Sequence, residues 1–171
     1  MRYNASLDTA AKIITGCITL LFAVIIFNYV FLKNELNSIY ISICIILTAV
    51  YILAFAFRPI GYSLNSTHLI IHRPIADLKI ERPRISSAVL IDRSDIGFAI
   101  RIFAVGGLFG YFGKYWSPKE GSITYYATQK DNLILVITRE KRKFIITPKN
   151  AEEFINDLKS LEFISGPANG I

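Results

Sequence analysis

The chain has 171 residues, of which 53% are hydrophobic, and its formal net charge is +6. Two cysteines are too few for a Cys-type metal cluster or a disulfide framework. The small positive excess, with no recognisable binding motif, gives no signature of nucleic-acid binding. Charge is unevenly spread, because residues 59–171 carry 15 Lys plus Arg against 11 Asp plus Glu, a net charge of +4. Composition therefore predicts an N-terminal part with uncharged apolar runs, followed by one compact domain.

Two long apolar runs, 13–32 and 39–57, contain no charged residue, histidine or proline. Each has about the ~20 residues that a helix needs to cross a hydrocarbon core of ~30 Å. Lipid offers no partner to backbone polar groups, so each run should be helical. The six-residue connector 33–38 permits only a tight turn. The sequence predicts a transmembrane hairpin; a buried core helix or a signal peptide is the alternative for a single run.

Basic residues lie mainly at the open end of this predicted hairpin: Arg2, Lys12, Arg58 and Arg73. In the connector, Lys33 is offset by Glu35. Since Lys and Arg are retained on the cytoplasmic side, both termini are predicted to be cytoplasmic. The expected location is a bacterial inner (plasma) membrane, crossed twice. Contact between the helices is expected from small and hydroxyl residues: Thr15, Gly16, Thr19, Ser42 and Thr48.

After Pro59 the periodicity changes from helical to extended. Seven segments are predicted to be strands: Ile60–Asn65, Thr67–Arg73, Asp77–Ile80, Ile85–Arg93, Ser122–Thr128, Asn132–Thr138 and Arg142–Thr147. Asn150 is a plausible N-cap for a final helix, which places Phe154, Leu158 and Leu161 on one face. This pattern predicts a small, partly open barrel with the helix plugging one end.

The longest interruption between predicted strands is the insertion 94–121, which contains glycines at 106, 107, 110 and 113 among aromatic residues. A phosphate-binding loop is not expected, because no Ser or Thr follows Lys114 and no helix is predicted to begin there. Three interpretations stay open: an ordered loop packed on the barrel, a patch that enters lipid headgroups, and a protein-docking surface. If the first four strands form a meander, the insertion faces the bilayer. The membrane- or partner-contacting candidates are Phe109, Phe112, Tyr115, Trp116, Lys114 and Lys119.

Two stretches carry a resemblance to a known family. One is the run Arg101–Gly113, and the other is Ile145–Pro148 followed by Glu153, Phe154, Ile155 and Leu158. Together with the predicted hairpin they resemble the bacterial family of PH-domain-containing membrane proteins, over nearly the whole chain. The resemblance implies a membrane anchor, a pleckstrin-homology-like fold and no settled activity. The expected fold class is therefore a transmembrane α-hairpin followed by a mainly-β, PH-like, partly open barrel of seven strands with a C-terminal helix. Its parts are residues 1–58, 59–165 and a tail at 166–171.

The expected function is a membrane-anchored PH-like binding or scaffold module that faces the cytoplasm. Its partner would be the membrane surface with its anionic headgroups, a protein, or a second copy. The alternative is an accessory subunit of a larger membrane complex, in transport or stress-response assembly. No enzymatic activity, cofactor, metal or nucleic acid is expected, and His68 and His72 are interpreted as exposed structural histidines. The uncharged segment Asn65–Thr67 argues against specific inositol-phosphate recognition.

Overall fold

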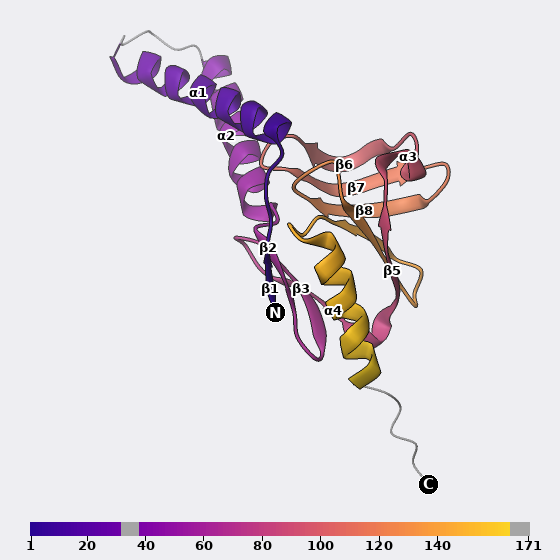
Figure 1. Cartoon of the computed structure of the whole chain (residues 1–171). Coiled ribbons are helices and arrows are strands. Elements are labelled where there is room, and N and C mark those ends of the chain that lie inside the picture. The colour runs from indigo at the N-terminus through magenta and orange to yellow at the C-terminus, as the bar shows by residue number, and fades with distance from the viewer. Residues whose placement is uncertain (32–37, 165–171) are drawn as a thin grey trace.

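The computed structural model describes residues 1–31 and 38–164. Two helices, α1 (Thr9–Phe31) and α2 (Ser38–Phe57), project from one end of a mainly-β domain (Figure 1). The domain ends in α4 (Ala151–Ile164). The connector 33–37 and the tail 166–171, which the sequence analysis assigned to a turn and to a C-terminal extension, lie outside the described residues.

The first sheet is antiparallel and joins both ends of the helical segment. Its strands are β1 (Arg2–Asn4), β2 (Gly61–Leu64), β3 (His68–His72) and β4 (Leu78–Glu81), in that order. Asn4 pairs with Gly61, so the chain leaves this sheet before α1 and re-enters it beside the same point after α2. Tyr3 of β1 is buried and packs edge-on against Phe154, with ring centroids 5.1 Å apart. Sequence reasoning did not predict β1.

The second sheet has six strands in the order β5-β9-β10-β8-β7-β6. They are β5 (Ile85–Ile91), β6 (Ile100–Gly106), β7 (Tyr111–Ser117), β8 (Gly121–Ala127), β9 (Leu133–Thr138) and β10 (Lys143–Ile146). A 3-10 turn (Arg82–Arg84) precedes β5, and a single helical turn, α3 (Arg93–Ile96), joins β5 to β6. All pairs are antiparallel except β8 with β10, which is parallel.

Two expectations about the strands were wrong. The described residues form ten strands in two sheets, not a barrel of seven strands. All seven predicted segments contain a strand within two residues of its expected ends, but β1, β6 and β7 are additional. The first four predicted strands do not form a meander either, because β5 leaves the first sheet and pairs with β9.

The main core lies between the first sheet, one face of the second sheet and α4. Phe154 is fully buried and Leu158 nearly so, as the apolar face of the closing helix predicted. Tyr62 and Leu69 contribute from the first sheet and Ile134 from the second. A second core on the other face of the second sheet includes Ala11 and Ile96, so the first turns of α1 belong to the packed domain. The burial of Phe154 and Leu158 confirms that this face of α4 packs on the core, whereas the side chain of Leu161, predicted on the same face, lies outside the described residues.

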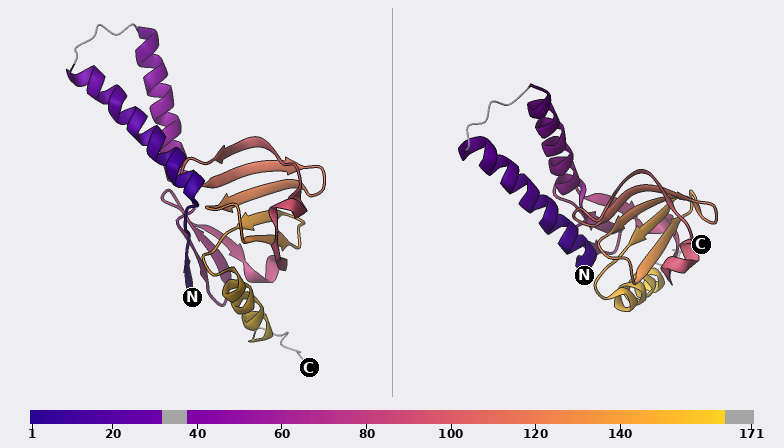
Figure 2. Two further views of the ribbon diagram at one scale, coloured as in Figure 1. Left: turned by 45° about the horizontal axis from the view of Figure 1, so that its top comes forward. Right: turned by 90° about the horizontal axis from the view of Figure 1, so that it is seen from above.

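Most described side chains of α1 and α2 are exposed. Leu20, Ile26, Ile45 and Ile46 are 60–66% exposed, and Figure 2 shows the two helices diverging as they leave the domain. One helical segment in the described residues, Thr9–Asn28, is long and apolar enough to cross a membrane. Its mean hydropathy is 2.3, and 6% of its most apolar stretch is buried. The apolar segment of α2, Ile41–Phe57, is shorter.

Candidate functional site

The turn between β6 and β7 lies against the base of α1. The Thr15 hydroxyl accepts a hydrogen bond from the Phe109 backbone N–H at 2.9 Å and donates one to the Gly107 carbonyl at 3.4 Å. Thr19 donates to the Thr15 carbonyl and lies 2.8 Å from the Tyr51 hydroxyl, which joins α1 to α2. We call this contact the helix junction. Its members are Thr15, Tyr51, Ala54, Phe55, Arg58, Gly107, Phe109 and Phe112.

Aromatic rings fill the α2 side of the helix junction. The Phe109 ring meets Tyr51 and Phe55 edge-on, with centroids 5.2 and 5.5 Å apart. The Arg58 guanidinium lies 4.4 Å from the Phe55 centroid and 5.2 Å from that of Phe109. Its Nε is buried without a hydrogen-bond partner. The two rings give this charge a cation–π environment at the base of α2.

Glycine is required where the turn approaches α1. Gly107 has φ +109°, and a Cβ at this position would lie 2.6 Å from the Cδ1 of Ile14. Gly113 has φ +114°, and a Cβ there would lie 2.4 Å from the Phe103 carbonyl oxygen on the neighbouring strand. Phe109 itself adopts φ +58°, which is uncommon for a residue with a side chain. The glycines thus permit close packing in a β-hairpin rather than forming an open loop.

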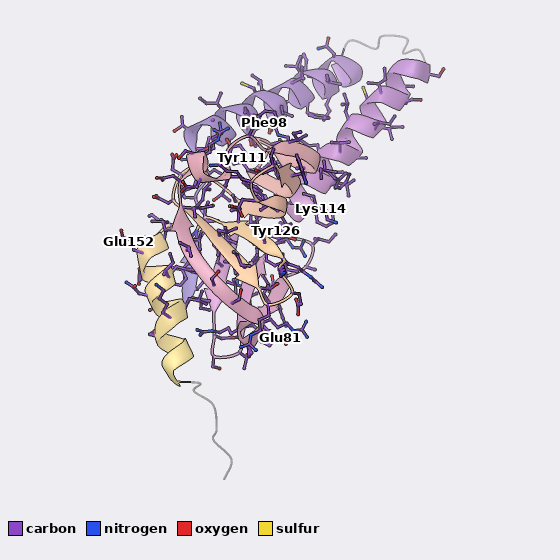
Figure 3. The ribbon with its side chains drawn as sticks, turned by 90° about the vertical axis from the view of Figure 1, so that its right-hand side faces the viewer. Glu81, Phe98, Tyr111, Lys114, Tyr126 and Glu152 are labelled. Atoms are coloured by element: carbon purple, nitrogen blue, oxygen red, sulfur yellow. The ribbon has the colours of Figure 1, made fainter. Side chains whose placement is uncertain are left out.

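Asp8 fixes the start of α1 on the second sheet. Its carboxylate accepts a hydrogen bond from the Ala11 backbone N–H at 2.7 Å and another from the Tyr111 hydroxyl at 3.3 Å. Its own N–H donates to the Thr128 carbonyl. Figure 3 shows Tyr111 close to the start of α1. Burial, together with the nearby Asp8 charge, raises the pKa of Tyr111 to about 12, so this phenol remains a hydrogen-bond donor at neutral pH.

The structure divides the six candidates of the Gly-aromatic insertion into two groups. Phe109, Phe112 and Tyr115 are 5–7% exposed, so the interpretation that places these three rings in an exposed patch was wrong. The first two are covered by α2, and the Tyr115 hydroxyl donates to the Val105 carbonyl within its own sheet. Trp116, Lys114 and Lys119 are exposed. Sequence reasoning treated the insertion as a loop and could not foresee that β6 and β7 bring its aromatics onto a helix.

Three members of the helix junction were not recognised as site residues from the sequence. Thr15 was expected to contact the other helix, but its hydroxyl bonds to the β6–β7 turn. Tyr51 was not predicted to take part in a contact, and Arg58 was considered only as one of the basic residues that set the orientation of the hairpin. The available signal was that the Thr15 hydroxyl and Arg58 lie at the open end of the predicted hairpin, one near the start of the first apolar run and one just after the second. That signal does not specify which segment they contact.

A separate hydrogen-bonded group joins β2, β3 and the residue that precedes β4. The Ser63 hydroxyl lies 2.7 Å from Nε2 of His72, whose Nδ1 lies 3.0 Å from the Asp77 carboxylate. This order matches that of a serine hydrolase triad. However, Ser63 lies within β2, which pairs with β1 and β3, so the neighbouring amides are engaged in the sheet rather than available to an oxyanion. The group links β2 and β3 to the residue before β4. No cluster of three metal-ligating side chains occurs among residues 1–31 and 38–164.

Comparison with known proteins agrees with the architecture of the β domain. The family described as Bacterial PH domain matches residues 60–162, which is more than half of the chain and runs from β2 into α4. No curated protein and no solved structure matches the chain. The matched segment excludes β1, α1 and α2, which pack on it. The chain belongs to the Bacterial PH domain family.

Proposed function

We propose that this protein is a membrane-anchored PH-like binding or scaffold module, held on the cytoplasmic face of a bacterial inner membrane by a transmembrane hairpin of α1 and α2. One observation carries the proposal. Asn4 and Gly61 are paired neighbours in one sheet, and two apolar helices lie between them in the sequence. A segment that leaves and re-enters the same sheet must begin and end on the same side of a membrane. Two crossings satisfy that condition.

Solvent exposure supports a lipid environment for both helices. Leu20 and Ile26 of α1 and Ile45 and Ile52 of α2 are at least 59% exposed. Removing one such side chain from water is worth about 1.5–3 kcal/mol. A contiguous apolar surface of this extent on a water-soluble monomer would be exceptional. In a bilayer, the same side chains contact acyl chains.

Basic residues at the base of the helices support a cytoplasmic domain. Lys12 lies in the second turn of α1, and Arg58 directly follows α2. The Arg73 guanidinium lies 5.8 Å from the Phe57 ring centroid. These three charges lie where the helices meet the domain, and positive charge at a helix end favours the cytoplasmic side.

A cleaved signal sequence is the competing explanation for α1, and the position of β1 argues against it. Removing α1 together with the preceding residues would remove Tyr3 from the main core and expose its neighbour Phe154. It would also remove Ala11 from the second core. The segment before α1 is therefore part of the folded domain.

Carbonate extraction combined with intact-mass measurement tests the proposal. Membranes from cells expressing the full chain are washed at alkaline pH, and the retained protein is weighed by mass spectrometry. The proposal predicts retention in the membrane pellet with a mass that includes β1 and α1. Release into the wash, or a mass that lacks these elements, would contradict the anchor.

A second candidate is the accessory subunit of a larger membrane complex. The observation that favours it is an apolar cavity of about 530 Å³ between the diverging helices, lined by Phe22, Ile26, Cys44, Ile45, Thr48 and Ile52 among others. A helix of another subunit would fill such a groove. Purification in a mild detergent separates the candidates. A stoichiometric protein partner favours the subunit, and co-purified anionic lipid alone favours the module.

A further inference from the structure

The edge strand β6 and its surroundings expose large apolar side chains. Phe103 is 85% exposed, Phe98 is 75% and Ile102 is 63%. Ile100 and Trp116 are 48% and 43% exposed. We call these five residues the β6 surface. Scattered exposed apolar residues are normal, but four on the adjoining strands β6 and β7, with Phe98 just before β6, make a patch of the kind that marks an interaction site.

Strand register makes part of the β6 surface continuous with the helix junction. In antiparallel strands, directly opposite residues point to the same face. Val105 lies opposite Phe112, Phe103 opposite Lys114, and Ile100 opposite Trp116. The first of these pairs packs against Ala54 of α2. One face of β6 and β7 therefore continues outward from the base of α2 as exposed apolar side chains, with Lys114 among them.

The β6 surface lies at the end of the domain from which the helices project. Figure 1 shows β6 at the edge of its sheet, in the part of the domain from which α1 and α2 project. Figure 3 places Phe98 and Lys114 in this part of the domain, and Glu81 at the opposite end. A bilayer that surrounds the two helices would meet this surface first.

We propose that the β6 surface enters the headgroup region of the same bilayer that holds the helices, and so fixes the orientation of the domain. The inference rests on the proposed function. The β6 surface combines Phe and Trp side chains with a neighbouring lysine, Lys114. This composition suits the membrane interface, where aromatic rings are favoured and lysine attracts anionic lipid. The domain then has two attachments, the helix junction and the β6 surface. Its opposite end, with Glu81, faces the cytosol.

A lipid surface fits β6 better than an added strand does. An edge strand can pair with another chain, but bulges protect edges against such pairing. The register of β6 shifts between Arg101 and Phe103, where Ile102 is the extra residue. A bulge bends the strand and interrupts the regular row of hydrogen-bonding groups that a partner strand would need.

Trp116 is the only tryptophan in the chain, so its fluorescence tests the β6 surface directly. The full chain is reconstituted into anionic vesicles whose lipids carry bromine either near the headgroup end or near the methyl end of the acyl chain. The proposal predicts strong quenching by the shallow bromine and weak quenching by the deep one. Phe103→Ser combined with Phe98→Ser should reduce the shallow quenching, whereas Phe103→Leu should preserve it. Both positions are exposed, so folding should be unaffected.

Two reporter variants separate this inference from the proposed anchor. In a Trp116→Phe background, Phe22→Trp reports on α1 and Glu152→Trp on the exposed side of α4. Quenching at position 22 without quenching at position 116 overturns the β6 proposal and leaves the anchor intact. No quenching at position 22 contradicts the anchor itself.

If position 116 is protected from both bromolipids and aqueous acrylamide, and that protection depends on the protein-to-lipid ratio, a second copy covers β6 and the lipid proposal is wrong. Position 152 should remain unquenched throughout.

Discussion

The hydroxyl of Thr15 on α1 accepts a hydrogen bond from the backbone N–H of Phe109, 94 positions later in the sequence. Phe109 in turn packs against Tyr51 and Phe55 of α2. One residue of the β6–β7 turn therefore contacts both helices. The PH-like domain is joined to its proposed anchor by this packing as well as by the two chain connections. The following predictions use the full chain in detergent micelles or vesicles, because a fragment that begins after α2 would lack β1.

Thr15→Val should weaken the helix junction while conserving shape. The substitution leaves the Phe109 N–H without its acceptor, and an unsatisfied buried donor costs about 1–3 kcal/mol. We expect the free energy of unfolding in urea to fall by that amount, measured through Trp116 fluorescence. Thr48→Val, at a residue that lines the cavity between the helices, is the control and should leave the unfolding free energy nearly unchanged. Equal losses in both variants would show that the Thr15 hydrogen bonds do not join helix and turn.

Gly113→Ala should disrupt the β6–β7 hairpin. Its Cβ would lie 2.4 Å from the Phe103 carbonyl oxygen and 2.6 Å from the Ala104 Cα, so the two strands would have to separate. Gly121→Ala is the matched control, because Gly121 also has positive φ but has open space around it. A non-glycine residue in left-handed backbone costs roughly 1–2 kcal/mol. Thermal unfolding should show a clearly larger loss for Gly113→Ala, and similar losses would contradict the assigned strand contact.

Phe154→Ala should destabilise the main core. Phe154 is fully buried, and truncation of a buried phenylalanine typically costs about 3–5 kcal/mol. A melting temperature many degrees lower is expected by circular dichroism. Glu152→Ala, an exposed position on the same helix, should leave the melting temperature almost unchanged. An unaltered melting temperature for Phe154→Ala would show that α4 does not plug the domain in solution.

Stability should decrease at strongly alkaline pH. Burial raises the pKa of Tyr62, and hydrogen bonding to Thr147 lowers it by less, so that the pKa moves from 10.0 to about 12. Below pH 10 this phenol is protonated in both folded and unfolded chains, so its contribution to the free energy of unfolding is fully present. Above pH 10 the unfolded chain loses the proton first, and the contribution is lost as pH rises through the folded value. Tyr62→Phe should therefore flatten the decline of unfolding free energy between pH 10 and about 12. An identical slope would contradict the burial of this hydroxyl.

How far the sequence predicted this molecule depends on the range of the interactions. Alternating residues such as Leu69 and Ile71, and the helical spacing of Phe154 and Leu158, are local patterns, and they identified the strands β2–β5, the strands β8–β10 and the core face of α4. Strand β1 is only three residues long and owes its conformation to β2, more than fifty residues later. Such a segment has no local signal.

The sequence predicted which segment forms the candidate site, but it did not predict which side chains of that segment are buried. The sequence identified the Gly-aromatic insertion as special, and the structure places it against the helices. The sequence left open whether Phe109 and Phe112 are packed or exposed, because their burial depends on α2, which no spacing within the insertion encodes. The bulge at Ile102 breaks the period-two pattern of β6, and four glycines make its neighbourhood resemble a loop. Exposed Phe98 and Ile102 were missed for the same reason.

The central claim is that α1 and α2 form a hairpin with both chain ends on the cytoplasmic side. Cysteine accessibility in intact cells tests it most directly. Cys17 and Cys44 are first replaced by serine, and single cysteines are introduced at Asn37, between the helices, and at Lys159, an exposed residue of α4. With a maleimide that enters the periplasm but does not cross the inner membrane, we predict labelling at position 37 and labelling at position 159 only after permeabilisation. Labelling of both positions, or of position 159 alone, in intact cells would contradict the hairpin or its orientation.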